Sequence, residues 1–325
     1  MWLSATSLPM PAVAQTGEVQ PSVEDTSAVA ADTANHKAEE ETFIDTSQRV
    51  ISENLLNLSR RVDEFFSGSR MMEESEGSYA CLSANVFFEE SGQQDVYADY
   101  CLKFRLPGTQ RRWKLVIAST EENYDEGKQK PGTEPIPPLP AEETTGLAGL
   151  RYIAEETVLR HINFDAGVRT SLPLNPFARA RFRRTWTPDS WLLRLTENLY
   201  WYKEEGTGLL SRVDVERVLG TKWYFRSTSE GDYRWQPDEW RLLQSFGVYK
   251  RVGKNQALNL EWQIVATARD NTKVDYYVYR LRYRIKMWRE WFFLEVSPQL
   301  LYDRERDFEA LAGLFLKAEI AFGDF

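Results

Sequence analysis

The stretch Lys273–Met287 reads KVDYYVYRLRYRIKM and alternates apolar and basic residues over most of its length. From Tyr277 to Met287 every second residue is apolar or aromatic, and the residues between them from Arg280 to Lys286 are basic. Because successive side chains of a β-strand point to opposite faces, one face of this strand is apolar and the other is charged. Glu309–Phe322, at the end of the chain, repeats the pattern with Lys317 and Glu319 on its polar face.

Alternation of this kind recurs from Ser78 onward and predicts fourteen strands, with twelve as the alternative count. Most segments run about 9–13 residues, the length that a tilted strand needs to cross a bilayer. The expected strands are Tyr79–Glu89, Asp95–Leu106, Arg112–Ser119, Gly146–Glu155, Val158–Thr170, Phe177–Trp186, Trp191–Lys203, Gly208–Leu219, Thr221–Ser229, Glu239–Val252, Gln256–Arg269, Lys273–Met287, Trp291–Tyr302 and Glu309–Phe322.

The composition excludes several classes of protein. The chain of 325 residues has a net charge of −9, a mean hydropathy of −0.51 and no apolar stretch of about 18 residues, which excludes a bundle of membrane helices. Two Cys and two His exclude a Cys/His zinc framework. There is no phosphate-binding glycine loop and no H-E-x-x-H motif, so we expect neither a metal nor a cofactor, and no nucleic acid as a partner.

A soluble antiparallel sheet also alternates, so other features must decide between it and a transmembrane barrel. The connections on one side of the expected sheet are short, whereas the other side holds the long gaps Thr120–Thr145 and Glu230–Asp238. Membrane barrels have short turns at one end and longer loops at the other, with aromatic girdles at both interfaces. The tryptophans beside the short turns are the expected girdle: Trp113, Trp186, Trp191, Trp223, Trp288 and Trp291. We therefore predict an all-β, antiparallel transmembrane barrel.

The chain stops at Phe325, directly after an alternating strand. Here the sequence resembles the outer-membrane β-barrel proteins of Gram-negative bacteria, and no subfamily is recognised. The resemblance implies insertion into outer-membrane lipid, with Phe322 and Phe325 read by the barrel assembly machinery. An even strand count puts both chain ends on the short-turn side, which implies periplasmic termini and long loops outside.

The chain before the barrel divides by composition. Residues 1–14 resemble a signal peptide, because Ala12-Val13-Ala14 matches an A-x-A cleavage site, and residues 15–41 are polar and expected to be disordered. Residues 42–77 combine an amphipathic helix, 42–66, with an acidic connector, and residues 78–325 form the barrel with its acidic, Pro-rich loop 120–145. We expect the helix to lie outside a charged lumen, on the periplasmic side, where a periplasmic protein is a candidate partner.

The polar faces of the strands suggest two roles for the lumen. The expected rows of charge are Arg179, Arg181, Arg183, Arg280, Arg282, Arg284, Lys286, Glu261 and Glu295. Such a wall favours anions if the lumen is open, or forms a structural charge network with acids such as Asp214, Glu216 and Glu319, which is the favoured alternative.

Two further predictions concern single residues. In a hairpin that turns around Ser91, Cys81 lies opposite Cys101, and an oxidising compartment permits a disulfide between them. His161 is the candidate base of a lipid-modifying enzyme, but it lacks the His, Ser and Asn set of outer-membrane phospholipase A, and an ordinary lumen His is favoured. No catalytic residue is therefore assigned.

These observations favour a non-enzymatic outer-membrane pore or structural barrel for small polar solutes, anions among them. The alternatives are an outer-membrane lipid-modifying enzyme and a soluble β-sheet binding protein.

Overall fold

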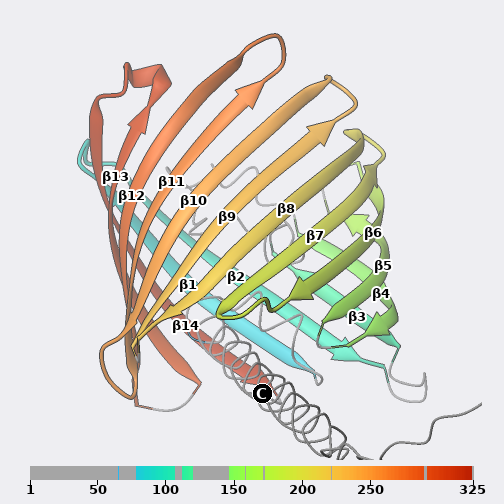
Figure 1. Cartoon of the computed structure of the whole chain (residues 1–325), viewed down its shortest axis with the longest axis horizontal. Helices are drawn as coiled ribbons and strands as arrows, with labels where there is room; N and C mark the ends of the chain where they lie inside the picture. Colours follow the sequence, from blue (N-terminus) through green and yellow to red (C-terminus); the bar gives the residue numbers. More distant parts are fainter. Residues whose placement is uncertain are drawn as a thin grey trace, which may run out of the picture. The chain divides into compact units, whose positions relative to one another are not determined.

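The computed structural model describes residues 65, 78–106, 112–119, 146–157, 159–170, 173–220, 222–288 and 291–323. Its strands form one closed antiparallel barrel, drawn in Figure 1 as strongly tilted arrows. Each strand pairs with its neighbours in the sequence, and β1 pairs with β14 to close the sheet. The prediction of an all-β antiparallel barrel of fourteen strands is therefore confirmed, and the count of twelve is excluded.

The elements are β1 Tyr79–Glu89, β2 Gln94–Arg105, β3 Trp113–Ala118, β4 Leu147–Glu156, β5 Arg160–Arg169, β6 Asn175–Trp186, β7 Trp191–Tyr202, β8 Gly206–Leu219, β9 Trp223–Arg234, β10 Glu239–Arg251, β11 Gln256–Ala268, β12 Thr272–Lys286, β13 Phe292–Asp303, the short 3-10 helix η3 Arg304–Arg306, and β14 Ala310–Gly323.

The two ends of the barrel are named by the strands that reach them. The terminal rim holds the start of β1 and the end of β14, and the distal rim holds the opposite strand ends. In a simple up-and-down order, the turns β2–β3, β4–β5 and so on lie at the terminal rim, and β1–β2, β3–β4 and so on at the distal rim.

The sequence predicts two long gaps between strands, and one of these two predictions is wrong. β9 continues to Arg234 and β10 begins at Glu239, so the expected loop Glu230–Asp238 is a turn of residues 235–238. Gly231 and the acidic residues around it disguise the strand, but Glu230 and Asp232 face the interior while Gly231 and Tyr233 face outward. The ring of Tyr233 packs on Trp235 and Trp240, at 5.3 and 4.9 Å between centroids, which stabilises the strand ends.

The remaining long connection, 120–145, lies outside the described residues, as do the expected signal peptide, the tail and, except for Phe65, the helix 42–66. Within the described part of the chain, no helix has both the length and the apolar character needed to cross a membrane.

Candidate functional site in the barrel interior

The two faces of the barrel wall differ sharply in polarity. On β12, Arg284 is 2% exposed and Arg280 is also buried, whereas their neighbour Tyr279 is 47% exposed. On β7, buried Arg194 lies between Leu193 and Leu195, which point the other way. A soluble protein buries its apolar face, so this arrangement is inverted. It is the arrangement of a transmembrane barrel, with lipid outside and a polar interior.

The interior of β12–β14 holds a network of paired charges. Arg282 donates two hydrogen bonds to Glu295, at 2.7 and 2.9 Å. Arg284 lies between Glu295 and Glu319 and donates to Glu319 at 2.8 Å, while Lys317 forms an ion pair with Glu319 at 3.2 Å. Buried charges need such partners, because leaving one unpaired costs its full desolvation. Part of the basic row seen in the sequence therefore lies in a structural network.

A second network joins β8 and β9. Arg226 pairs with Glu216 at 2.9 Å, and the hydroxyl of Tyr224 also donates to Glu216, which is fully buried. Asp214 lies on the same face of β8, two residues from Glu216 toward the distal rim. It accepts from Arg212 at 3.0 Å and from the hydroxyl of Thr228 at 2.5 Å. Arg212 and Arg226 were not singled out from the sequence, where each has a serine on one side and an apolar residue on the other, so the alternation around them is weaker.

The wall of β5–β7 is different because basic residues dominate it. Arg179, Arg181, Arg183 and Arg194 all face the interior, and Asp165 is the one acidic side chain on the interior face of these three strands. Asp165 is engaged by Arg151 of β4 through two bonds of 2.8 and 2.9 Å. Arg179 donates to the Tyr202 hydroxyl and lies over the Phe177 ring at 4.6 Å. This basic wall is the part of the interior with the strongest single sign of charge.

Glu261 is placed on the interior face of β11, opposite Arg280 in the register. Its side chain is buried, and neither carboxylate oxygen accepts a hydrogen bond in the described part of the chain. Asn259 lies on the same face, and neither the nitrogen nor the oxygen of its side-chain amide forms a hydrogen bond in the described part of the chain. Lys286 lies at the terminal rim, with its ammonium 5.8 Å from the centre of the Phe293 ring.

On the side of β7–β11, the interior near the terminal rim is apolar. Leu192, Tyr224, Tyr249 and Ala257 form a buried cluster, and Phe65 and Val218 pack against it. Phe65 is helical, and its ring meets that of Phe293 edge-on at 6.1 Å. Phe293 shares the interior face of β13 with Glu295, so the expectation that the helix stays outside the lumen is wrong for Phe65. That expectation assumed a charged lumen along its whole length, but these apolar side chains, called the apolar collar, line this end on the β7–β11 side.

The tryptophans expected to form a girdle all lie near the terminal rim, and those within the strands face outward. Trp288 is the most exposed of them, and three basic side chains stack on others: Arg184 on Trp186, Arg217 on Trp191 and Lys250 on Trp223. A second aromatic group that was missed in the sequence, Trp201, Trp235 and Trp240, is exposed near the distal rim. Trp191 and Trp201 are separated by about 33 Å along β7 at about 3.3 Å per residue. With a tilt of about 40° this spans about 25 Å, the height of a membrane barrel's apolar band.

The remaining candidate residues are the two cysteines and the two phenylalanines near the end of the chain. Cys81 and Cys101 form the expected disulfide, with their Cα atoms 5.0 Å apart. Phe322 is exposed on the outer face and packs on Trp291, with ring centroids 5.3 Å apart, while Phe325 lies outside the described residues.

His161 is buried on the interior face of β5. No cluster of three or more metal-ligating side chains exists in the described ranges.

Comparisons with known proteins agree with this fold. No family model matches the sequence, and no curated protein does. Among solved structures, an outer-membrane protein of Vibrio cholerae, OmpT with loop L8 deleted, is 9% identical with a TM-score of 0.50, covering 75% of this chain and 98% of that one.

Two further structures are similar at lower scores. The outer-membrane channel DcaP of Acinetobacter baumannii is 10% identical, with a TM-score of 0.46 and coverage of 76% and 96%. OprB of Pseudomonas putida is 8% identical, with a TM-score of 0.47 and coverage of 80% and 97%. Closure of the sheet, an apolar outer face and a polar interior agree with the first of these likenesses, and the chain has the fold of an outer-membrane β-barrel protein.

Proposed function

We propose that this chain is a non-enzymatic outer-membrane barrel that passes small polar solutes and prefers anions. The observation that carries the proposal is the basic wall of β5–β7, where Arg179, Arg181, Arg183 and Arg194 share one interior face with a single acid, Asp165. Among all described buried side chains, ten are basic and seven are acidic, so the excess of positive charge is not confined to that wall. Fixed positive charge along a narrow path attracts anions and repels cations.

The opposite wall supports this division of roles. Arg282 and Arg284 of β12 pair with Glu295 and Glu319, so the charge of these two arginines is largely compensated within the wall. A solute passing between the two walls meets more basic than acidic side chains on the β5–β7 side. A lipid-modifying enzyme is disfavoured, because His161, the candidate base that the sequence offers, points into the barrel and away from the lipid that such an enzyme would attack.

Conductance in planar bilayers tests the proposal. With a salt gradient across the bilayer, the wild-type protein should give a reversal potential of the sign expected for anion preference. Replacing Arg179 and Arg181 together by Gln should move that potential toward the non-selective value. Lys250→Gln is the matched control, because Lys250 lies on the outer face over Trp223 and its loss should leave selectivity unchanged.

Two results would contradict the proposal. A wild-type barrel that is folded but passes no current would exclude a pore. Cation preference, or an equal shift for Lys250→Gln and the double variant, would exclude the basic wall as the selective element.

A further inference from the structure

The outer wall carries a group of polar side chains where lipid tails are expected. They are called the mid-wall patch and comprise Glu197 on β7, Ser211 on β8, Ser227 and Ser229 on β9, and Gln244 on β10. All five alternate with interior residues and therefore point outward. On the other ten strands, the outward-facing residues of the central part of each strand are apolar or aromatic. The patch is thus confined to four neighbouring strands.

The depth of the patch matters for what can bind it. Ser227 and Ser229 lie between Trp223 and Tyr233, the aromatic residues at the two ends of β9. Glu197 lies between Trp191 and Trp201 on β7. The two aromatic girdles mark the lipid interfaces, so the patch lies near the middle of the hydrocarbon layer. Lipid tails offer no hydrogen-bond partner at that depth, and polar groups facing them are costly.

The patch satisfies part of its own hydrogen-bonding capacity. The amide of Gln244, which also donates to the carbonyl of Ser245 at 3.3 Å, is fully bonded, whereas the hydroxyl of Ser227 and Oε1 of Glu197 retain capacity. The hydroxyl of Ser211 donates to Oε2 of Glu197 at 2.6 Å, and this is the one hydrogen bond of the carboxylate in the described part of the chain. Ser229 donates to Gln244 at 2.5 Å, and Gln244 donates to Ser227 at 3.0 Å. The patch therefore presents both donors and acceptors, and a second copy of the same surface is complementary to it.

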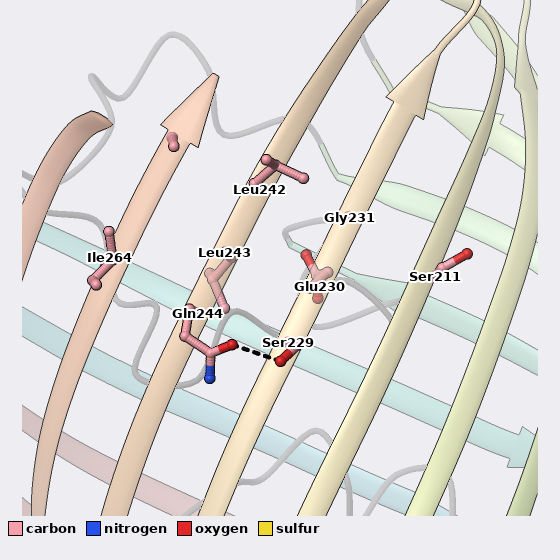
Figure 2. Close-up of a pocket in the computed structure, with 9 residues that line it drawn as sticks. Ser211, Ser229, Glu230, Gly231, Leu242, Leu243, Gln244 and Ile264 are labelled. Carbon is pink, nitrogen blue, oxygen red and sulfur yellow. Dashed lines mark hydrogen bonds between the residues drawn. The ribbon is translucent and has the colours of Figure 1, made fainter. Parts of the chain in front are cut away.

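A groove lies beside these side chains. Its volume is about 440 Å³, and Figure 2 shows it over β9 and β10, where Ser229 and Gln244 are joined by a dashed line. Gly231 lines it together with Leu242 and Ile264, and the ring of Trp240 covers the face of Gly231. Small residues that leave a depression beside polar groups are typical of packed contacts between membrane-embedded segments.

An aromatic row continues the same surface onto the next strands. Phe246 stacks on Trp262 at 5.5 Å between centroids, and Trp262 stacks on Tyr279 at 6.1 Å. Trp262 is far from both girdles along β11, so an interfacial position does not explain it. Aromatic side chains are enriched where proteins contact one another.

We infer that the outer wall of β7–β10, centred on the mid-wall patch, is the surface through which two copies of this chain bind each other in the membrane. Each copy supplies donors and acceptors for the other at the same depth. Exposed apolar side chains of one copy, such as Val213 on β8, pack against the groove of the other, which Leu242 and Ile264 border.

The test uses membranes solubilised with a polymer that keeps the native lipid, followed by measurement of the particle's protein mass. The particle formed with the wild-type protein should contain two or more copies of the chain. A triple variant, Glu197→Leu, Ser211→Leu and Gln244→Leu, should contain one copy, because it replaces polar groups by side chains that lipid solvates well. The control variant places leucines on the opposite wall, at Ala84, Ala98 and Ala318, which are paired in register on β1, β2 and β14.

The control should associate as the wild type does, and all variants should keep the heat-dependent gel mobility of a folded barrel. A wild-type particle with one copy would overturn the inference, whether that copy is alone or bound to a different protein. Unchanged association of the folded triple variant would overturn it as well. If the triple variant fails to fold, the single variant Gln244→Leu decides in the same way, through a measurable loss of the multi-copy particle.

Discussion

At the scale of single residues, the interior depends on charges that have one another as partners. Arg284 is the central case, because it is buried between Glu295 and Glu319. Replacing it by Met leaves two buried carboxylates without their shared cation. We expect a loss of about 3–5 kcal/mol in the free energy of unfolding, the usual cost of breaking a buried ion pair. Urea unfolding in lipid vesicles, followed by tryptophan fluorescence, measures it.

The control for this variant is Lys286→Met, two residues along the same face. Lys286 lies at the terminal rim and is only partly buried, so its loss should cost about 1 kcal/mol or less. Equal losses for the two variants would show that the network does not stabilise the barrel.

Phe65 provides a second prediction at this scale. Its ring packs on the apolar collar at the terminal rim and on Phe293. Phe65→Ala removes that contact from the interior, so the unitary conductance in planar bilayers should rise. Phe292→Ala, on the outer face of β13, removes a ring of the same size from the lipid side and should not change it. Identical conductance for wild type and Phe65→Ala would mean that Phe65 does not restrict the path.

At the scale of elements, the β1–β2 hairpin is held by the Cys81–Cys101 disulfide, which closes a loop with a sequence separation of 20. Cross-links of this length stabilise by about 3 kcal/mol through the unfolded chain. β1 is also held by β14, so Cys81→Ser with Cys101→Ser should still fold but unfold at lower urea concentration. Alkylation of the denatured, unreduced wild type should label no thiol, and labelling of two thiols would refute the bond.

At the scale of the whole molecule, the prediction concerns orientation in the membrane. We expect the terminal rim in the periplasm and the distal rim outside. Both native cysteines are in the disulfide, so single introduced cysteines report position. Asp270→Cys in the β11–β12 turn should react with a membrane-impermeant maleimide on intact cells, whereas Lys254→Cys in the β10–β11 turn should react only after permeabilisation. The reverse pattern would mean that the barrel is inverted.

The strands, their two faces and the disulfide could all be predicted from the order of residues alone. Alternation is a local property, so KVDYYVYRLRYRIKM identifies a strand with one charged face without knowledge of its neighbours. The pairing of a hairpin that turns around Ser91 likewise predicts Cys81 opposite Cys101, as the structure has them. The strand prediction failed at Glu230–Arg234, where a glycine among polar residues carries no clear period, although cross-strand aromatic contacts complete the strand.

Which charges meet, and which side chains gather on one wall, depended instead on the closed three-dimensional arrangement. Arg284 and Glu319 are 35 positions apart, and their contact depends on the stagger of three strands and on the reach of two long side chains. The mid-wall patch likewise combines single polar residues of four strands, each ordinary in its own segment. The collar around Phe65 depends on apolar residues from several strand ends meeting inside a closed ring. Such gatherings follow from closure of the sheet, because local periodicity states which face a residue takes but not which neighbours it finds there.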